Sequence, residues 1–239
     1  MPKNELIFEG DALSLLSKGD IEIVQRMPDS SNATFLATVT LEGLSTPVIY
    51  KPLRGERPLW DFPPGLHRRE VAAYRLSESL GLHFVPPTVL RDGPAGEGSV
   101  QFFIDADLEA HYFTLFEQHP ELHDVFRAIC AFDIVINNTD RKSGHCLIDK
   151  RQQVWAIDHG ICFSSEFKLR TVIWEFGGEA LDPNVRQSIA QLANTVPLDI
   201  ATLLDDDEVS ALQERAKWLA DNGVLPVDRS RSRYPWPLV

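Results

Sequence analysis

The segment 136–163 constrains the fold more than any other part of this chain. A polar loop carrying Asp140 is followed by two short apolar runs, 145–148 and 154–157, and then by Asp158. A polar, turn-like stretch separates the two runs, so they predict a β-hairpin. Because a hairpin turns the chain back on itself, we expect the two aspartates, 18 residues apart, to face one cleft.

The residues before this segment predict the helix that leads into it. Between 121 and 136, apolar side chains recur at the spacing of a helix with one buried face. The helix should end near Asn137 and Asn138, since asparagine is a poor helix former and a good turn residue. The segments 183–194 and 207–222 show the same amphipathic pattern and predict two further helices.

Two carboxylates in one cleft suit phosphoryl transfer. One carboxylate accepts the proton of the attacking hydroxyl, and the other holds the metal that bridges the nucleotide phosphates. In this chain Asp140, in the loop after the helix, is the candidate for the first role. Asp158, which follows the second strand and precedes a glycine, is the candidate for the second.

These residues carry a resemblance to known kinases. The segment 132–141, FDIVINNTDR, resembles the catalytic loop of type II phosphatidylinositol 4-kinases and of HipA-like serine kinases, and 157–160, IDHG, resembles their metal-binding loop. The whole chain is similar to a bacterial family labelled phosphatidylinositol 3-/4-kinase-like. This resemblance implies a two-lobed, protein-kinase-like α+β fold. It places an N-terminal lobe at 1–104 and a C-terminal lobe at 105–239, and it implies ATP and a divalent metal, magnesium or manganese, as cofactors.

A kinase also requires a lysine and a glutamate upstream, and this chain supplies both. The β-branched and aromatic run 48–50 ends at Lys51, which matches the third-strand lysine that contacts the nucleotide phosphates. Glu70 opens a predicted helix that runs to about Leu80 and is stopped by Gly81. We expect a Lys51–Glu70 ion pair facing the same cleft as Asp158. The alternative is an unrelated surface lysine and surface glutamate.

The loop that would cover the nucleotide lies between the predicted strands 22–25 and 34–39. It contains Ser30, Ser31 and Asn32 and has no glycine-rich signature. Serine and asparagine can turn tightly and present N–H and hydroxyl groups to phosphate. The alternative is a plain β-turn between two strands.

Three further segments complete the predicted N-terminal half. A strand over 100–104 would place Phe102 and Phe103 near the adenine, although both rings could equally be core residues. The glycine-rich stretch 92–98 predicts a flexible loop between strands. The proline- and aromatic-rich stretch 54–65 either folds over the cleft or packs as a surface flap.

One residue departs from the pattern of the resembled kinases. Five residues after the catalytic aspartate they place a metal-binding asparagine, whereas this chain has His145. Imidazole suits manganese and later metals better than magnesium. His145 could therefore shift the metal preference, bind substrate or mark weakened catalysis; the alternative is a histidine that caps the first strand. Lys142 is a candidate for stabilising the γ-phosphate, against the alternative of a solvated loop lysine.

The segment 164–178 corresponds to the activation segment of kinases and would contact the acceptor substrate. Its candidate contact residues are Lys168, Arg170, Trp174 and Glu175.

Composition bounds the class of protein. The chain has 239 residues, of which 44% are hydrophobic, enough for a sizeable core. Its net charge of −12 argues against nucleic acid and anionic membranes as partners. The N-terminus lacks a signal peptide, and no apolar run approaches the about 20 residues of a membrane span, so we expect a cytoplasmic protein without integral membrane association. Cys130, Cys146 and Cys162 should be buried thiols without a disulfide.

We therefore expect an ATP-dependent phosphotransferase acting on a hydroxyl of a small molecule or a protein. Two alternatives remain open at this point. The first is a nucleotide-binding pseudokinase with a regulatory role, and the second is an enzyme that transfers AMP on a kinase fold.

Overall fold

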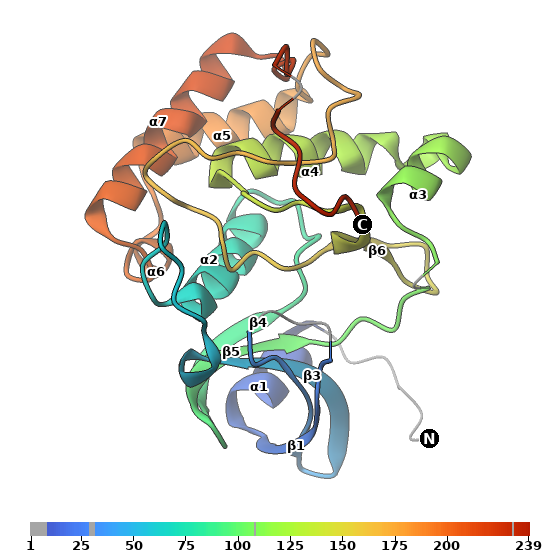
Figure 1. Ribbon diagram of the computed structural model, residues 1–239, viewed down its shortest axis with the longest axis vertical. Helices are drawn as coiled ribbons and strands as arrows, with labels where there is room; N and C mark the ends of the chain where they lie inside the picture. The colour runs from blue at the N-terminus through green and yellow to red at the C-terminus, as the bar shows by residue number, and fades with distance from the viewer. Residues whose placement is uncertain (1–8, 29–31, 108, 231) are drawn as a thin grey trace.

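The computed structural model describes residues 9–28, 32–107, 109–230 and 232–239 (Figure 1). Five antiparallel strands form one sheet in the order β1-β2-β3-β5-β4. Their bounds are β1 Asp20–Arg26, β2 Phe35–Leu41, β3 Leu44–Pro52, β4 Thr88–Gly93 and β5 Gly96–Phe102. A second, two-stranded sheet consists of β6 (Cys146–Ile148) and β7 (Val154–Ala156). The predicted hairpin after Asp140 is therefore confirmed.

The larger sheet has two chemically different faces, because successive side chains of a strand point to opposite sides. One face packs against α1 (Glu9–Lys18), a helix that the sequence pattern did not predict. The buried residues of that cluster are Leu15, Leu16, Ala37, Val39, Val48, Tyr50 and Val100. Lys51 lies on the opposite face, paired with Ser99 of β5. The register of β3 thus directs the lysine away from this cluster.

Helix α2 (Leu66–Ser79) packs against β4 and β5. It begins four residues earlier than the sequence predicted, so Glu70 lies in its second turn rather than at its start. The early start is possible because Gly65 adopts a left-handed conformation, with a φ of 102°, immediately before the helix. The predicted stop at Gly81 is confirmed, with a φ of 71°.

The prediction of a flexible loop over 92–98 was wrong, since these residues belong to the tight β4–β5 hairpin. Its glycines are needed for packing rather than for mobility. A Cβ atom on Gly93 would lie 2.8 Å from the Tyr50 ring, and one on Gly98 would lie 2.6 Å from the Lys51 carbonyl. Likewise, the predicted strand 100–104 ends at Phe102.

The second half of the chain is mainly helical (Figure 1). Its helices are α3 Tyr112–Gln118, α4 His123–Ile136, α5 Pro183–Asn194, α6 Leu198–Ala201 and α7 Asp206–Asn222. The predicted helices at α4, α5 and α7 are confirmed, whereas α3 was not predicted. Helix α4 ends as expected at Asn137, whose left-handed φ of 54° starts the loop to Asp140. Within the described residues, no helix is both long and apolar enough to cross a membrane.

The main hydrophobic core extends from α2 and α4 to α7 and encloses all three cysteines. Cys130, Cys146 and Cys162 are buried free thiols, as predicted. An ion pair also crosses this region, between Arg69 of α2 and Glu208 of α7, and both side chains are almost completely buried. The α+β prediction is confirmed, and α2, which carries Glu70, is attached to the helical half as well as to the sheet.

We predict that Arg69→Met lowers the free energy of unfolding by about 3–5 kcal/mol, because it leaves the Glu208 carboxylate buried without its partner. Urea unfolding followed by circular dichroism measures this change. Lys217→Met is the matched control, since it removes an exposed pair with Asp221 and should cost at most about 1 kcal/mol. Equal losses in the two variants would show that the buried pair does not hold α2 in place.

Candidate active site

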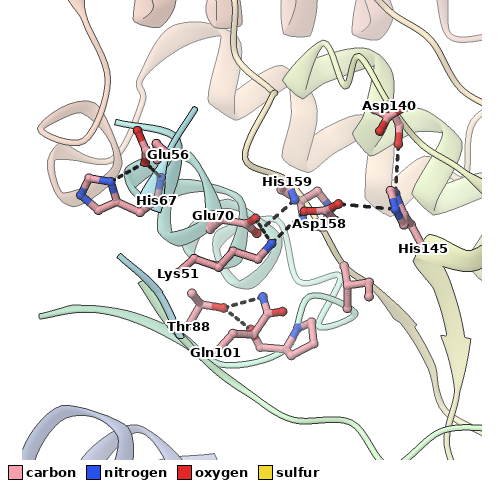
Figure 2. A network of polar contacts seen from close by, with 12 residues as sticks. Lys51, Glu56, His67, Glu70, Thr88, Gln101, Asp140, His145, Asp158 and His159 are labelled. Atoms are coloured by element: carbon pink, nitrogen blue, oxygen red, sulfur yellow. Dashed lines mark hydrogen bonds and ion pairs between the residues drawn. The ribbon is translucent and has the colours of Figure 1, made fainter. Parts of the chain in front are cut away.

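Lys51 lies between two carboxylates that come from distant parts of the chain (Figure 2). Its ammonium contacts Glu70 of α2 and lies 2.7 Å from Asp158 Oδ1. The ion pair expected from the sequence is therefore present, and Lys51 faces Asp158. The Lys51 ammonium holds the pKa of Asp158 well below its usual range. Burial alone would lower the pKa of Lys51, but the charges of Asp158 and Glu70 raise it.

The loop that carries Asp158 is joined to α2 by a second contact. The backbone N–H of His159 donates to Glu70 Oε2 at 3.0 Å, so both oxygens of this buried carboxylate are used. Asp158 itself has a φ of 62°, a left-handed conformation that turns the chain sharply after β7. A Cβ atom on Gly160 would lie 3.3 Å from Glu70 Oε1, which leaves little space for a larger residue.

A buried charge pair builds the loop that carries Asp140. Asp133, in the last turn of α4, accepts hydrogen bonds from Nε and Nη2 of Arg141, and neither side chain reaches solvent. Asn138 donates to the same aspartate at 2.9 Å and accepts from the backbone N–H of Asp140 at 3.0 Å. The side chains of Asp133, Arg141 and Asn138 thus fix the backbone of the Asp140 loop through buried hydrogen bonds.

Arg141 also connects the two loops. Its Nη2 donates to His159 Nε2 at 2.7 Å, and its Nη1 donates to the carbonyl of Ile157 at 2.8 Å. Burial holds the pKa of His159 well below its usual range, so its ring is neutral and its proton resides on Nδ1. The sequence patterns did not single out Asp133, Arg141 or His159, although each lies within the two motifs that identified the aspartates.

His145 lies between the two aspartates (Figure 2). Its Nδ1 lies 3.0 Å from the Asp140 carbonyl and donates to it, which leaves the lone pair of Nε2 facing Asp158 Oδ2 at 3.4 Å. Burial lowers the pKa of His145 to about 4, so the ring is neutral near pH 7. A histidine fixed through one nitrogen by a carbonyl is the usual form of a metal ligand. Nε2 and the Asp158 carboxylate thus present one nitrogen and one oxygen donor, and within the described residues no group of three or more His, Cys, Asp or Glu side chains could hold a metal ion.

The Asp140 side chain is part-buried beside Lys142, whose ammonium lies 3.4 Å from Oδ2. Burial raises the pKa of Asp140 to about 6, against the opposing charge of Lys142. The structure thus brings together Asp140, Lys142, His145, Asp158 and Lys51, which the sequence had singled out for one cleft.

The residues of the N-terminal half that were predicted to contact the nucleotide do not gather at one place in the structure. Ser30 and Ser31 lie outside the described residues. Asn32 accepts a hydrogen bond from the Arg57 backbone at 2.9 Å, which ties the loop to the insertion. Phe102 packs into the cluster beneath α1, on the face opposite to Lys51, and this favours the alternative of a core residue. Phe103 is half-buried beyond the end of β5.

Gln101, the residue before Phe102, lies on the other face of the sheet. It pairs with Ile49 and is thus on the same face of the sheet as Lys51, and it is buried. Its amide donates to Thr88 Oγ1 at 2.9 Å, and both residues lie beneath Lys51 in Figure 2. Only the strand register distinguishes Gln101 from its neighbour, and the sequence alone did not fix that register.

The insertion 54–65 is attached to its surroundings at both ends. Glu56 accepts hydrogen bonds from the backbone N–H groups of His67 and Gly65. Lys168 donates to the Asp61 carbonyl at 2.7 Å, and its ammonium lies 5.1 Å from the centre of the Phe62 ring. The insertion is therefore packed against the start of α2 and against Lys168 of the segment 164–178.

In the segment 164–178, which was predicted to contact the acceptor, most candidate side chains are already bonded within the fold, whereas Arg170 is not. Glu175 accepts hydrogen bonds from the Tyr112 hydroxyl and the Trp174 backbone, and the Trp174 indole donates to the Arg233 carbonyl. Together with Lys168, these side chains are engaged within the fold. Arg170 is exposed, and its side chain makes no hydrogen bond or ion pair within the described residues.

The C-terminal segment lies against these loops (Figure 1). The Leu238 carbonyl accepts a hydrogen bond from the Ser143 backbone at 2.8 Å, and the Arg233 carbonyl accepts one from the Thr171 backbone at 3.1 Å. The turn that carries Lys142 and His145 is therefore supported by residues almost a hundred positions further along the chain. No sequence pattern indicated this contact.

Comparison with known proteins agrees with the fold. No protein-family model matches this chain. Among solved structures, the Helicobacter pylori proinflammatory kinase CtkA is similar with a TM-score of 0.53 at 12% identity, covering 88% of this chain and 94% of that chain. Hydra Fam20, solved with sugar, is similar with a TM-score of 0.56 at 15% identity, covering 89% of this chain and 87% of that chain. The fold is therefore kinase-like.

A protein of known sequence is more closely similar. Protein Rv2133c of Mycobacterium tuberculosis (strain ATCC 25618 / H37Rv) is 37% identical, and the alignment covers 97% of each chain. The chain therefore combines a kinase-like fold with a lysine, Lys51, that is held beside Asp158. By its similarity over nearly the full length of both proteins, this chain belongs to the family of Rv2133c.

Proposed function

We propose that this protein is an ATP-dependent phosphotransferase of the atypical, phosphatidylinositol 3-/4-kinase-like class. The observation that carries the proposal is the position of Lys51, which contacts Glu70 on one side and Asp158 on the other. In kinases, the lysine–glutamate pair aims an ammonium at the phosphates, and the aspartate holds metal beside them. The kinase-like fold of the chain supports the same reading.

Each residue then has a distinct role in the transfer. Lys51 binds the phosphates of ATP, and Glu70 fixes Lys51. Asp140 orients the acceptor hydroxyl and takes up its proton as the acceptor oxygen bonds to the γ-phosphorus. The bond between that phosphorus and the β–γ bridging oxygen breaks, and ADP leaves with that oxygen. Lys142, within 3.4 Å of Asp140, is positioned to stabilise the transferred group. The acceptor is a hydroxyl of a small molecule or a protein.

The candidate metal ligands are Asp158 and His145. A divalent cation held by these side chains would neutralise charge on the β- and γ-phosphates of ATP. The Asp140 carbonyl holds the His145 ring with Nε2 facing Asp158, so these two side chains present one oxygen and one nitrogen donor. An imidazole donor is less suited to magnesium than a carboxamide oxygen is.

We predict that manganese supports ATP binding at least as well as magnesium does, because His145 supplies nitrogen. Thermal-shift titrations with ATP and each metal measure this preference. His145→Asn replaces nitrogen with oxygen at similar size and should move the preference toward magnesium. If the wild-type protein responded to magnesium alone, and the variant behaved identically, His145 would not be a ligand.

We predict that Asp140→Ala and Asp158→Ala have different effects. Asp140→Ala should leave ATP affinity nearly unchanged while lowering the rate of transfer by about 10²–10³-fold, the usual cost of one well-placed catalytic group. Asp158→Ala should weaken binding of the metal–nucleotide complex itself. Calorimetric titration with ATP and metal, together with the rate of ATP consumption, separates the two effects.

Asp124→Ala is the matched control, since Asp124 is exposed at the opposite end of α4 and should alter neither quantity. Equal losses of ATP affinity in the Asp140 and Asp158 variants would contradict the assigned roles. The mass of the modified acceptor provides an independent check. A gain of one phosphoryl group is expected, whereas a gain of one adenylyl group would identify an AMP transferase.

A further inference from the structure

Arg170 is an exposed cation that stands next to the catalytic loop with its side chain unused. Its guanidinium makes no hydrogen bond or ion pair with any residue that the structure describes. Yet the fold fixes its backbone closely. The Arg170 N–H donates to the Asn138 carbonyl at 2.8 Å, and the Arg141 N–H donates to the Arg170 carbonyl at 3.1 Å. These two bonds hold Arg170 beside the backbone on both sides of Asp140.

The neighbouring cations differ from Arg170 because each already has a partner. Arg141 is buried against Asp133, and Lys142 lies beside Asp140. Lys168 is bound to the Asp61 carbonyl and stacked near Phe62. Arg233, on the C-terminal segment, lies with its guanidinium 4.9 Å from the centre of the Phe167 ring. In this part of the described structure, Arg170 offers a guanidinium that is free to bind a ligand.

Arg170 lies at the reacting end of the site, because its backbone is bonded to Asn138 and Arg141, on either side of Asp140. Arg170 contacts neither Lys51 nor Asp158, the groups assigned to the nucleotide and its metal. With a net charge of −12, the protein as a whole repels anions. An anionic ligand would therefore need a local cation such as this one.

We propose that Arg170 binds an anionic group of the acceptor, a phosphate, sulfate or carboxylate, while the acceptor hydroxyl lies at Asp140. A guanidinium presents a planar fork of donors that matches these oxyanions in a bidentate manner. This inference rests on the proposed function, because it assigns the substrate class of the same site. It makes the acceptor an anionic hydroxyl compound, and Arg170 the residue that selects for its charge.

Nuclear magnetic resonance of the arginine Nε–Hε groups tests the inference directly. The full-length protein is saturated with magnesium and a non-hydrolysable ATP analogue and then titrated with inorganic sulfate. We expect the Arg170 signal, assigned from its loss in Arg170→Lys, to shift and saturate. The Arg151 signal is the internal control, since Arg151 is exposed in the β6–β7 turn and its side chain has no described partner. It should not saturate.

Variants and a matched pair of probes give the quantitative test. Sulfate affinity, followed at the Arg141 backbone amide, should fall by about 10- to 100-fold in Arg170→Gln, as expected for loss of hydrogen bonds to a charged group. It should be unchanged in Arg151→Gln. Glycerol 3-phosphate should shift the Arg170 signal at concentrations at which glycerol does not.

Three results would overturn the inference. The Arg170 and Arg151 signals could respond equally to sulfate, glycerol could act as well as glycerol 3-phosphate, or the ATP analogue could abolish the sulfate response. The last result would assign Arg170 to the nucleotide phosphates instead of the acceptor. Failure of the proposed function would look different, because the ATP analogue itself would then cause no shift at Lys51 or Asp158.

Discussion

The ion pairs of one lysine hold the candidate active site together. Lys51 comes from the sheet, Glu70 from α2 and Asp158 from the loop after β7, and the three meet at a single ammonium group. Glu70 is buried and would not tolerate this position without a cation, whereas the Asp158 side chain is about half exposed. The His159 backbone adds a further bond to Glu70, so α2 and the loop after β7 cannot separate without breaking both contacts.

The loop that carries Asp140 depends on the buried pair of Asp133 and Arg141. Arg141 bonds to the last turn of α4, to the Ile157 carbonyl and to the His159 ring, and therefore couples the Asp140 loop to the Asp158 loop. The network permits few alternative arrangements of the two loops, although His159 Nδ1 is buried without a hydrogen-bond partner within the described residues.

Some parts of this arrangement could be read from local pattern. Helix α4, its end at Asn137 and the β6–β7 hairpin were each predicted. Each of them depends on interactions between residues that are close in the sequence. Prediction from local pattern failed for segments whose conformation depends on contacts with residues distant in the sequence. The glycines of 92–98 looked like a flexible loop but are required by the Tyr50 ring and the β3 backbone, and α1 was missed entirely.

The sequence by itself nominated the candidate residues for chemistry: order and spacing within the two motifs indicate Asp140 and Asp158, and His145 was indicated by its departure from the resembled pattern. It also paired Lys51 with Glu70 through their resemblance to a known arrangement. Only the tertiary structure decided which face of the sheet each strand residue takes, and hence that Gln101 rather than Phe102 shares the face of Lys51. Only the tertiary structure showed that the Lys168 side chain is hydrogen-bonded within the fold, whereas the Arg170 side chain has no hydrogen-bond partner among the described residues. The physical reason is that strand register and side-chain partnership arise from contacts between residues distant in the chain, which no local pattern encodes.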